Sequence, residues 1–342
     1  MGRRKRVDWE NLTDSELFDI RLCDLGLRIE GTWIEKAMES LYGELERREL
    51  QIRPHAWLST EFFVPHGIPG IGIPFYLAHP RLMQLERKEM REVEGGTRAE
   101  LMMILRHETG HVLDNAFHLG RDPKVRELFG RWTTRYPEQY TPTPSSKRYV
   151  HHLRLYYAQS HPHEDFAETF AVILGTRGNR WRKDYADWPA LEKLEYVNEL
   201  IERLRGRSPR LRNKRRSDPL DNMRMTLGEY YKQKHERYDD SFPSTYDGDL
   251  KRLFSDDPKH RHRELASQFL RRNRSEIRGM LSNWTRDVEY TREQVLKDLI
   301  GRSRELKLRA TGPERTLKRE FAILLAVKTM DFHYHQRKSF AL

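Results

Sequence analysis

Residues 97–120 read TRAELMMILRHETGHVLDNAFHLG, and this stretch predicts one long helix. Thr97, with Glu100 three residues later, matches a capping box, the pattern that marks a helix start. Apolar residues then recur at helical spacing as far as Gly120, which is a typical stop signal. The predicted helix therefore carries the pentad HETGH, at residues 107–111, on an ordered element.

On a helix, this pentad places two imidazoles one turn apart on the same face. His107 and His111 can then reach one tetrahedral Zn²⁺, while Glu108 projects toward water on the open coordination position. Zinc hydrolases use this arrangement, with the carboxylate as general base. A third protein ligand must come from elsewhere in the chain, because such sites have three ligands and a water.

The segment HPHEDFAETFAVIL, residues 161–174, predicts a second helix. Glu164 and Glu168 lie one turn apart on a face otherwise suited to burial. Two such carboxylates are costly to bury unless they bind a cation or gain strong hydrogen-bond partners. We therefore predict Glu164 as the third zinc ligand. Glu168 or Asp165 is predicted to orient a ligand histidine through its other ring nitrogen.

Other residues stay open for these roles on the sequence alone. The layout H-E-x-x-H-x-x-G-x-x-H is excluded, because its third histidine would fall on Phe117. Asp114, one turn beyond His111, is predicted either to fix a ligand histidine or to cap local backbone. Four histidines remain rivals of Glu164: His151, His152, His161 and His163.

Two segments together resemble a zinc-binding metallopeptidase family of bacteria: HETGHVLD at residues 107–114 and YAQSHPHEDFAE at residues 157–168. They are similar, more distantly, to the catalytic domain of anthrax lethal factor, a gluzincin. The resemblance spans roughly residues 25 to 180. It implies that Glu164 is the third zinc ligand and that Tyr157 donates a hydrogen bond to the developing oxyanion. Taken from the residues alone, Tyr157 is an ordinary packed tyrosine.

Composition restricts where such a protein acts. The only cysteine is Cys23, which rules out an internal disulfide framework and favours a reducing cytoplasm. No apolar run approaches the ~20 residues of a membrane-spanning helix. The basic start MGRRKR is followed by acidic residues rather than by an apolar signal core. We therefore expect a cytoplasmic protein without a membrane partner.

Charge is distributed unevenly along the chain. From residue 207 to 342 there are 32 Lys and Arg against 20 Asp and Glu, which leaves 31 and 32 for the preceding part. We predict a catalytic domain at 8–206, a basic linker at 207–219 and a basic helical region at 220–342. The last region could bind an anionic partner, either nucleic acid or an acidic protein, although 20 acids among the 32 bases slightly favour an ordinary solvated charged face.

The remaining patterns locate further elements. Residues 68–77, IPGIGIPFYL, are either an edge strand that could accept an extended peptide substrate or an irregular loop packed on the core, and the sequence favours neither. Helical spacing recurs at 189–204 and in several segments between 265 and 325, while residues 228–258 read as loops. Tyr230, Tyr231 and Trp284 are aromatics among the basic residues of the C-terminal part.

The predicted fold class is α+β and mostly helical, with a zincin-like catalytic domain that contains a small sheet and an active-site helix. The predicted function is that of a zinc-dependent metalloendopeptidase, with peptides or proteins as substrates, Zn²⁺ as cofactor and Glu108 as general base. The alternative is a nucleic-acid-associated binding or regulatory protein in which the zinc site is structural or only occasionally proteolytic. A purely structural site requires neither Glu108 nor an open fourth position, which favours the enzyme.

Overall fold

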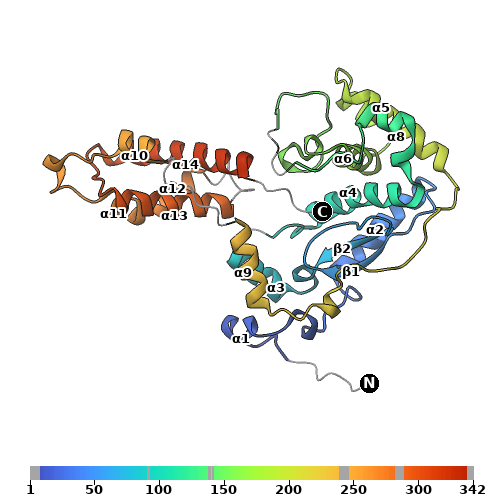
Figure 1. The fold of residues 1–342 in the computed structure, drawn as a ribbon, viewed down its shortest axis with the longest axis horizontal. Coiled ribbons are helices and arrows are strands. Elements are labelled where there is room, and N and C mark those ends of the chain that lie inside the picture. Colours follow the sequence, from blue (N-terminus) through green and yellow to red (C-terminus); the bar gives the residue numbers. More distant parts are fainter. Residues whose placement is uncertain are drawn as a thin grey trace. The chain divides into compact units, whose positions relative to one another are not determined.

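The computed structural model shown in Figure 1 describes residues 8–90, 93–137, 140, 142–238, 246–281 and 289–336. These residues divide into two compact units. Unit 1 holds residues 8–87 and 93–230, and unit 2 holds residues 88–90 and 231–336. The predicted domain bounds, 8–206 and 220–342, stay a prediction.

Unit 1 is built mainly of helices around one small sheet (Figure 1). Its elements are α1 (Asp14–Phe18), η1 (Leu22–Asp24), α2 (Trp33–Arg47), β1 (His55–Ser59), β2 (Gly70–Pro74), η2 (Phe75–Ala78), α3 (Pro80–Met90), α4 (Arg98–Phe117), η3 (Leu119–Arg121), α5 (Pro123–Phe129), η4 (Arg154–Gln159), α6 (Pro162–Gly175), α7 (Arg180–Asp184), α8 (Ala190–Leu204) and η5 (Leu220–Asn222). The last residues of α3, 88–90, belong to unit 2, and helix α9 (Leu227–Tyr238) begins in unit 1 and continues into unit 2.

The predicted central helix is confirmed as α4. Thr97 is its N-cap and accepts a hydrogen bond from the Glu100 N–H at 3.2 Å, which satisfies one of the free donors of the first turn. The helix ends earlier than the sequence signal at Gly120. His118 takes the left-handed conformation, with φ of 57°, and its N–H donates to the Asp114 carbonyl. A non-glycine residue therefore provides the stop.

Helix α6 lies against α4 and is almost entirely buried. Pro162 occupies its first turn, where a missing N–H costs nothing, as the sequence predicts. The pair approaches closely because position 110 is a glycine: a Cβ built there would lie 2.7 Å from the Ala167 Cα. This contact brings the carboxylates of α6 to the histidines of α4.

The sheet has two parallel strands, and Trp57 of β1 lies opposite Gly72 of β2. The predicted strand within residues 68–77 is confirmed as β2. Its outer edge, however, is not free at Gly72, because the Gly72 N–H donates to the Phe63 carbonyl at 2.8 Å and the Phe63 N–H donates back at 3.4 Å. At this point an extended peptide could not pair with β2 without displacing Phe63.

Unit 2 is helical in the part that the structure describes, with its own apolar core that includes Phe254, Phe269, Leu299 and Phe321. Its helices are α10 (Asp247–Leu253), η7 (Pro258–His260), α11 (Ala266–Arg272), α12 (Arg274–Leu281), α13 (Glu289–Glu305) and α14 (Glu314–Gln336). The helical spacing between residues 265 and 325 is therefore confirmed, whereas Trp284 lies outside the described residues.

The expectation of loops at residues 228–258 is wrong for the described residues of α9 and α10. Helix α9 has a start signal that the loop interpretation overlooked. Thr226 and Glu229 form a capping box, with the Thr226 N–H donating to the Glu229 carboxylate at 2.8 Å and the Glu229 N–H donating to Thr226 Oγ1 at 3.1 Å.

The described structure is thus mostly helical with a small parallel sheet, in agreement with the predicted α+β class. Among the helices within the described ranges, none combines the length and apolarity that crossing a bilayer requires.

Candidate metal centre

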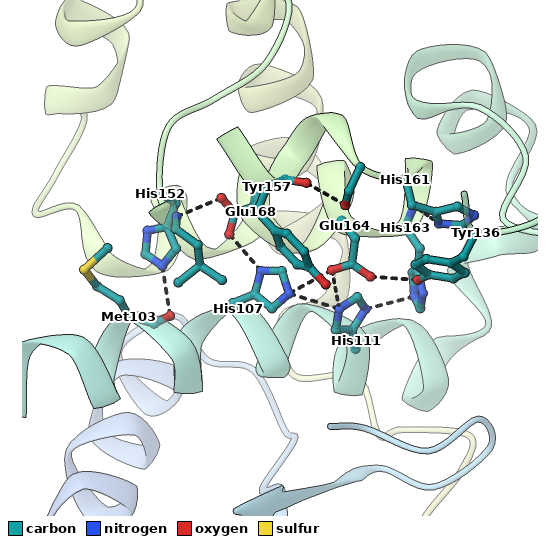
Figure 2. A network of polar contacts seen from close by, with 12 residues as sticks. Met103, His107, His111, Tyr136, His152, Tyr157, His161, His163, Glu164 and Glu168 are labelled. Carbon is teal, nitrogen blue, oxygen red and sulfur yellow. Dashed lines mark hydrogen bonds and ion pairs between the residues drawn. The ribbon is translucent and has the colours of Figure 1, made fainter. Parts of the chain in front are cut away.

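Three buried side chains from α4 and α6 converge on one point (Figure 2). His107 Nε2 and His111 Nε2 lie 3.2 Å apart, and Glu164 Oε2 lies 3.0 Å from the first and 3.2 Å from the second. All three side chains are at most 4% exposed. The two imidazoles and the carboxylate are therefore positioned to hold one metal ion.

The dimensions of this triangle suit zinc. Ligand atoms about 2.0–2.1 Å from a tetrahedral Zn²⁺ are about 3.3 Å from one another. The three observed separations of 3.0–3.2 Å are close to this spacing. Two imidazole nitrogens and one carboxylate oxygen are also a donor set that zinc accepts, and three protein ligands leave a fourth position open. The residues present fit the ion.

Glu168 contacts the first histidine on the side away from the triangle. Its Oε1 lies 2.8 Å from His107 Nδ1, the nitrogen that faces away from the triangle, and its Oε2 accepts the Leu153 N–H at 2.8 Å. A carboxylate at Nδ1 keeps the proton there and leaves Nε2 as a lone-pair donor. Burial lowers the pKa of His107, but hydrogen bonds to the Glu164 and Glu168 carboxylates outweigh it and hold this pKa well above its usual value, so zinc binding would release the proton from Nε2.

His163 is placed behind the second histidine. Its Nε2 lies 3.1 Å from His111 Nδ1, and Trp132 covers its ring at 4.7 Å between ring centroids. Asp114 Oδ2 lies 3.3 Å from the same His163 nitrogen, while Asp114 Oδ1 accepts the Gly120 N–H at 3.1 Å. Asp114 therefore caps local backbone and contacts His163 rather than a histidine of the triangle.

Tyr136, which no sequence pattern singles out, contacts the third residue of the triangle. Its hydroxyl donates to Glu164 Oε1 at 2.7 Å, so that Oε2 is the oxygen turned to the histidines (Figure 2). The Tyr136 ring stacks on His161 at 3.7 Å, and His161 Nε2 in turn donates to the Thr134 carbonyl at 2.9 Å. The irregular segment before α6 is thereby fixed to the start of that helix.

Asp165 faces away from the triangle. Its Oδ2 pairs with Lys193 Nζ of α8 at 2.5 Å, although burial raises the Asp165 pKa to about 7 against the pull of that lysine. Lys193 also lies over the Tyr149 ring at 4.5 Å and donates to the Arg148 carbonyl. Of the two carboxylates proposed to orient a ligand histidine, Glu168 contacts one and Asp165 pairs with a lysine instead.

Glu108 and Tyr157 flank the triangle. Glu108 is 4% exposed, and its Oε2 has no hydrogen-bond partner within the described parts of the chain. Burial raises the Glu108 pKa to about 7, partly opposed by the positive charge of His107. The Tyr157 ring lies 5.6 Å from the His107 ring and points toward the cluster (Figure 2). Burial, followed by the nearby Glu164 charge, raises the Tyr157 pKa well above its usual value, so this phenol keeps its proton.

The rival histidines take other partners. His152 Nε2 donates to the Met103 carbonyl at 2.9 Å, His151 packs on Trp188, and His161 caps α6 by accepting the His163 N–H. At the point where His107 Nε2 and His111 Nε2 converge, the structure places Glu164 and none of these four histidines; His163 meets His111 at its other ring nitrogen.

Comparison with known proteins agrees with this geometry. No curated protein and no solved structure matches the chain. Residues 77–180, which include α4, α6 and every member of the triangle, match the model of the family described as "Putative zinc-binding metallo-peptidase".

Proposed function

We propose that this protein is a zinc-dependent metallopeptidase that cleaves internal peptide bonds, with His107, His111 and Glu164 as zinc ligands. The triangle of two imidazole nitrogens and one carboxylate oxygen, with separations of 3.0–3.2 Å, carries the proposal. The family match supports it, because that family is described as zinc-binding peptidases. Since the third ligand is a glutamate, the site would be of the gluzincin type within a zincin-like fold.

Zinc, when bound, supplies Lewis acidity that lowers the pKa of coordinated water toward about 7 and polarises the scissile carbonyl. Glu108 accepts the proton of the attacking water as the water oxygen bonds to the carbonyl carbon. Tyr157 donates a hydrogen bond to the carbonyl oxygen as negative charge develops there. Glu108 then passes the proton to the leaving amine nitrogen, which completes hydrolysis without another reactant.

Other side chains would serve the ligands rather than the substrate. Glu168 would hold His107 with its proton on Nδ1, as its 2.8 Å contact suggests. Tyr136 would keep Glu164 bound through one oxygen by occupying the other. Neither residue needs to touch the substrate for these roles, so both are positioning residues.

The proposed substrates are peptides or unfolded segments of proteins, and the proposed location is the cytoplasm. The location is supported by the single cysteine, Cys23, which is free and partly buried. The alternative function as a nucleic-acid-associated protein gains no support from the metal centre, since a structural zinc would not require a buried carboxylate beside an open position.

The proposal is tested by measuring zinc content and peptide cleavage together. Purified protein should contain about one zinc per chain and should cleave members of a mixed peptide library, as detected by mass spectrometry. Removal of zinc with a chelator should abolish cleavage, and added Zn²⁺ should restore it. A protein with one zinc per chain that cleaves no library member would sink the proposal.

A further inference from the structure

A basic strap, defined as residues 207–216, follows α8. Six of its ten residues are Arg or Lys, and none is Asp or Glu. The strap contains neither helix nor strand and forms part of the long trace between α8 and α9 in Figure 1. Its composition is typical of a flexible linker. Whether it can present a binding surface therefore depends on its hydrogen bonds to the rest of the protein.

The strap is bonded to unit 1 along its length. Near its start, the Arg210 N–H donates to the Ala116 carbonyl at 2.8 Å. Further along, the Asn213 amide donates to the Gly67 carbonyl at 2.8 Å, and His55 Nε2 donates to the Arg215 carbonyl at 2.7 Å. Just beyond it, the Trp57 indole donates to the Ser217 carbonyl at 2.8 Å.

On the strap's side these bonds use backbone groups and Asn213; among its cationic side chains, Arg212 Nε donates within the strap to the Pro209 carbonyl at 3.2 Å. Exposure alternates over part of the strap: Arg210, Arg212 and Lys214 are exposed, whereas Leu211 and Asn213 between them are partly buried. Alternation is the pattern of a locally extended chain with one face on the protein. Among the described residues, Arg216 is the one strap cation within 4.0 Å of a carboxylate, that of Asp221.

The strap is tied to the helix of the metal centre. Ala116 accepts hydrogen bonds from the N–H groups of both Arg210 and Leu211, and it lies five residues after His111 on α4. A row of cations attached in this way belongs to the same unit as the proposed catalytic residues. A ligand held by the strap would therefore be held near the end of that helix.

We propose that the strap binds an acidic stretch of the polypeptide substrate; this inference rests on the proposed peptidase function and names a feature of its substrates. An extended peptide repeats its side chains on one face every ~6.6 Å, the same repeat as the alternating strap cations. The strap has no aromatic side chain for base stacking and no helix for a DNA groove, which disfavours nucleic acid as its partner.

The test measures binding to the full chain by fluorescence anisotropy with three labelled probes. The first is a twelve-residue peptide with Glu at every second position, the second replaces each Glu by Gln, and the third is a single-stranded DNA dodecamer. The Glu peptide should bind in low salt and lose affinity steeply in 300 mM NaCl, because exposed ion pairs are screened. The Gln peptide should not bind.

The decisive variant is the triple substitution Arg210→Gln, Arg212→Gln, Lys214→Gln, which changes exposed side chains only. Loss of three exposed ion pairs should weaken Glu-peptide binding about ten-fold. A matched control carries Arg304→Gln, Arg315→Gln and Arg319→Gln, three exposed residues of unit 2, and should bind as wild type does. Replacing the strap arginines 210 and 212 by lysine should keep most of the affinity.

Equal Glu-peptide affinity in wild type and the strap triple would overturn the proposal, as would tight binding of the DNA with none of the Glu peptide. Because binding is measured without cleavage, failure here is distinguishable from failure of the peptidase proposal. If cleavage is found, the strap triple should raise KM for acidic substrates with kcat unchanged. An equal loss for acidic and neutral substrates would contradict the strap's role.

Discussion

Gly110 of α4 and Ala167 of α6 meet so closely that a Cβ on Gly110 would lie 2.7 Å from the Ala167 Cα. The glycine lies between the two histidines of the pentad, and the alanine lies between Glu164 and Glu168. The contact therefore joins the two helices at the level where imidazoles and carboxylates must meet. The nearest atom, the Ala167 Cα, belongs to the backbone, so a larger residue at position 110 could not be accommodated by rotating a side chain.

Gly110→Ala should force the two helices apart. We expect a loss of about 1–3 kcal/mol in the free energy of unfolding, the usual cost of overpacking, together with weaker zinc binding. Gly43→Ala is the matched control, since it lies within α2 and its added Cβ would meet no atom closer than 3.7 Å. That variant should be stabilised by about 0.5–1 kcal/mol. Urea unfolding would measure the free energy of unfolding of both variants. An equal change in the two would contradict the claim that Gly110 is needed for the close approach of α4 and α6.

Glu168→Gln should weaken zinc binding by about 10–100-fold, because an amide is a poorer partner for His107 Nδ1 than a carboxylate. Competition with a chromophoric chelator would measure the affinity. Glu195→Gln serves as the control, because Glu195 pairs with the partly exposed Arg182 away from the centre. Zinc affinity within two-fold of wild type for Glu168→Gln would show that this carboxylate does not support the site.

The two tyrosines at the centre should differ in what they affect. Tyr157→Phe should lower kcat by about 10²–10³-fold with zinc affinity unchanged, as for loss of an oxyanion donor. Tyr136→Phe should instead weaken zinc binding by about ten-fold, because Glu164 Oε1 loses its donor. Stopped-flow kinetics and zinc competition would measure these two effects. If Tyr157→Phe weakened zinc binding and Tyr136→Phe lowered kcat alone, both assigned roles would be wrong.

Sequence reasoning located the parts of the site that obey helical spacing. His107, His111, Glu164 and Glu168 follow from two helices with side chains one turn apart, and the structure brings all four together. Helical periodicity states which residues share a face, but it does not state which neighbour that face meets. For that reason the sequence does not decide whether Asp165 or Glu168 contacts a ligand histidine. In the structure, Asp165 pairs with Lys193 instead.

Residues contributed by irregular segments had no such signal. Tyr136 reaches Glu164 from a loop 28 residues earlier in the chain, and only tertiary contacts such as stacking on His161 fix it there. The composition of residues 207–219 predicts a linker, because Pro, Ser and basic residues are typical of linkers. Their hydrogen bonds to Ala116, Gly67 and β1 depend on carbonyl groups whose positions the sequence does not reveal.

Protonation of His152 should lower the free energy of unfolding as the pH is lowered from 7.5 to 5.5, whereas the raised pKa values of Glu108 and Asp165 act in the opposite direction. Burial lowers the His152 pKa below its usual 6.5, so the folded protein takes up this proton less readily than the unfolded chain. The contribution of neutral His152 to the free energy of unfolding is therefore complete above pH 6.5 and is lost as the pH falls below that value. His152→Gln, which can keep the donor to the Met103 carbonyl, should remove this contribution, so that in urea unfolding with chelator present the variant gains stability relative to wild type as the pH falls. A stability difference between the two proteins that stays constant with pH would contradict this.

The measurement that tests the central claim most directly compares wild type with Glu108→Gln for zinc content and for the rate of peptide cleavage. Glu108 is buried beside the triangle without being part of it, so the variant should bind one zinc per chain as wild type does. Its cleavage rate should fall by about 10²–10⁴-fold, the usual contribution of a general base. A variant that retains zinc and cleaves within a few-fold of the wild-type rate would contradict the account.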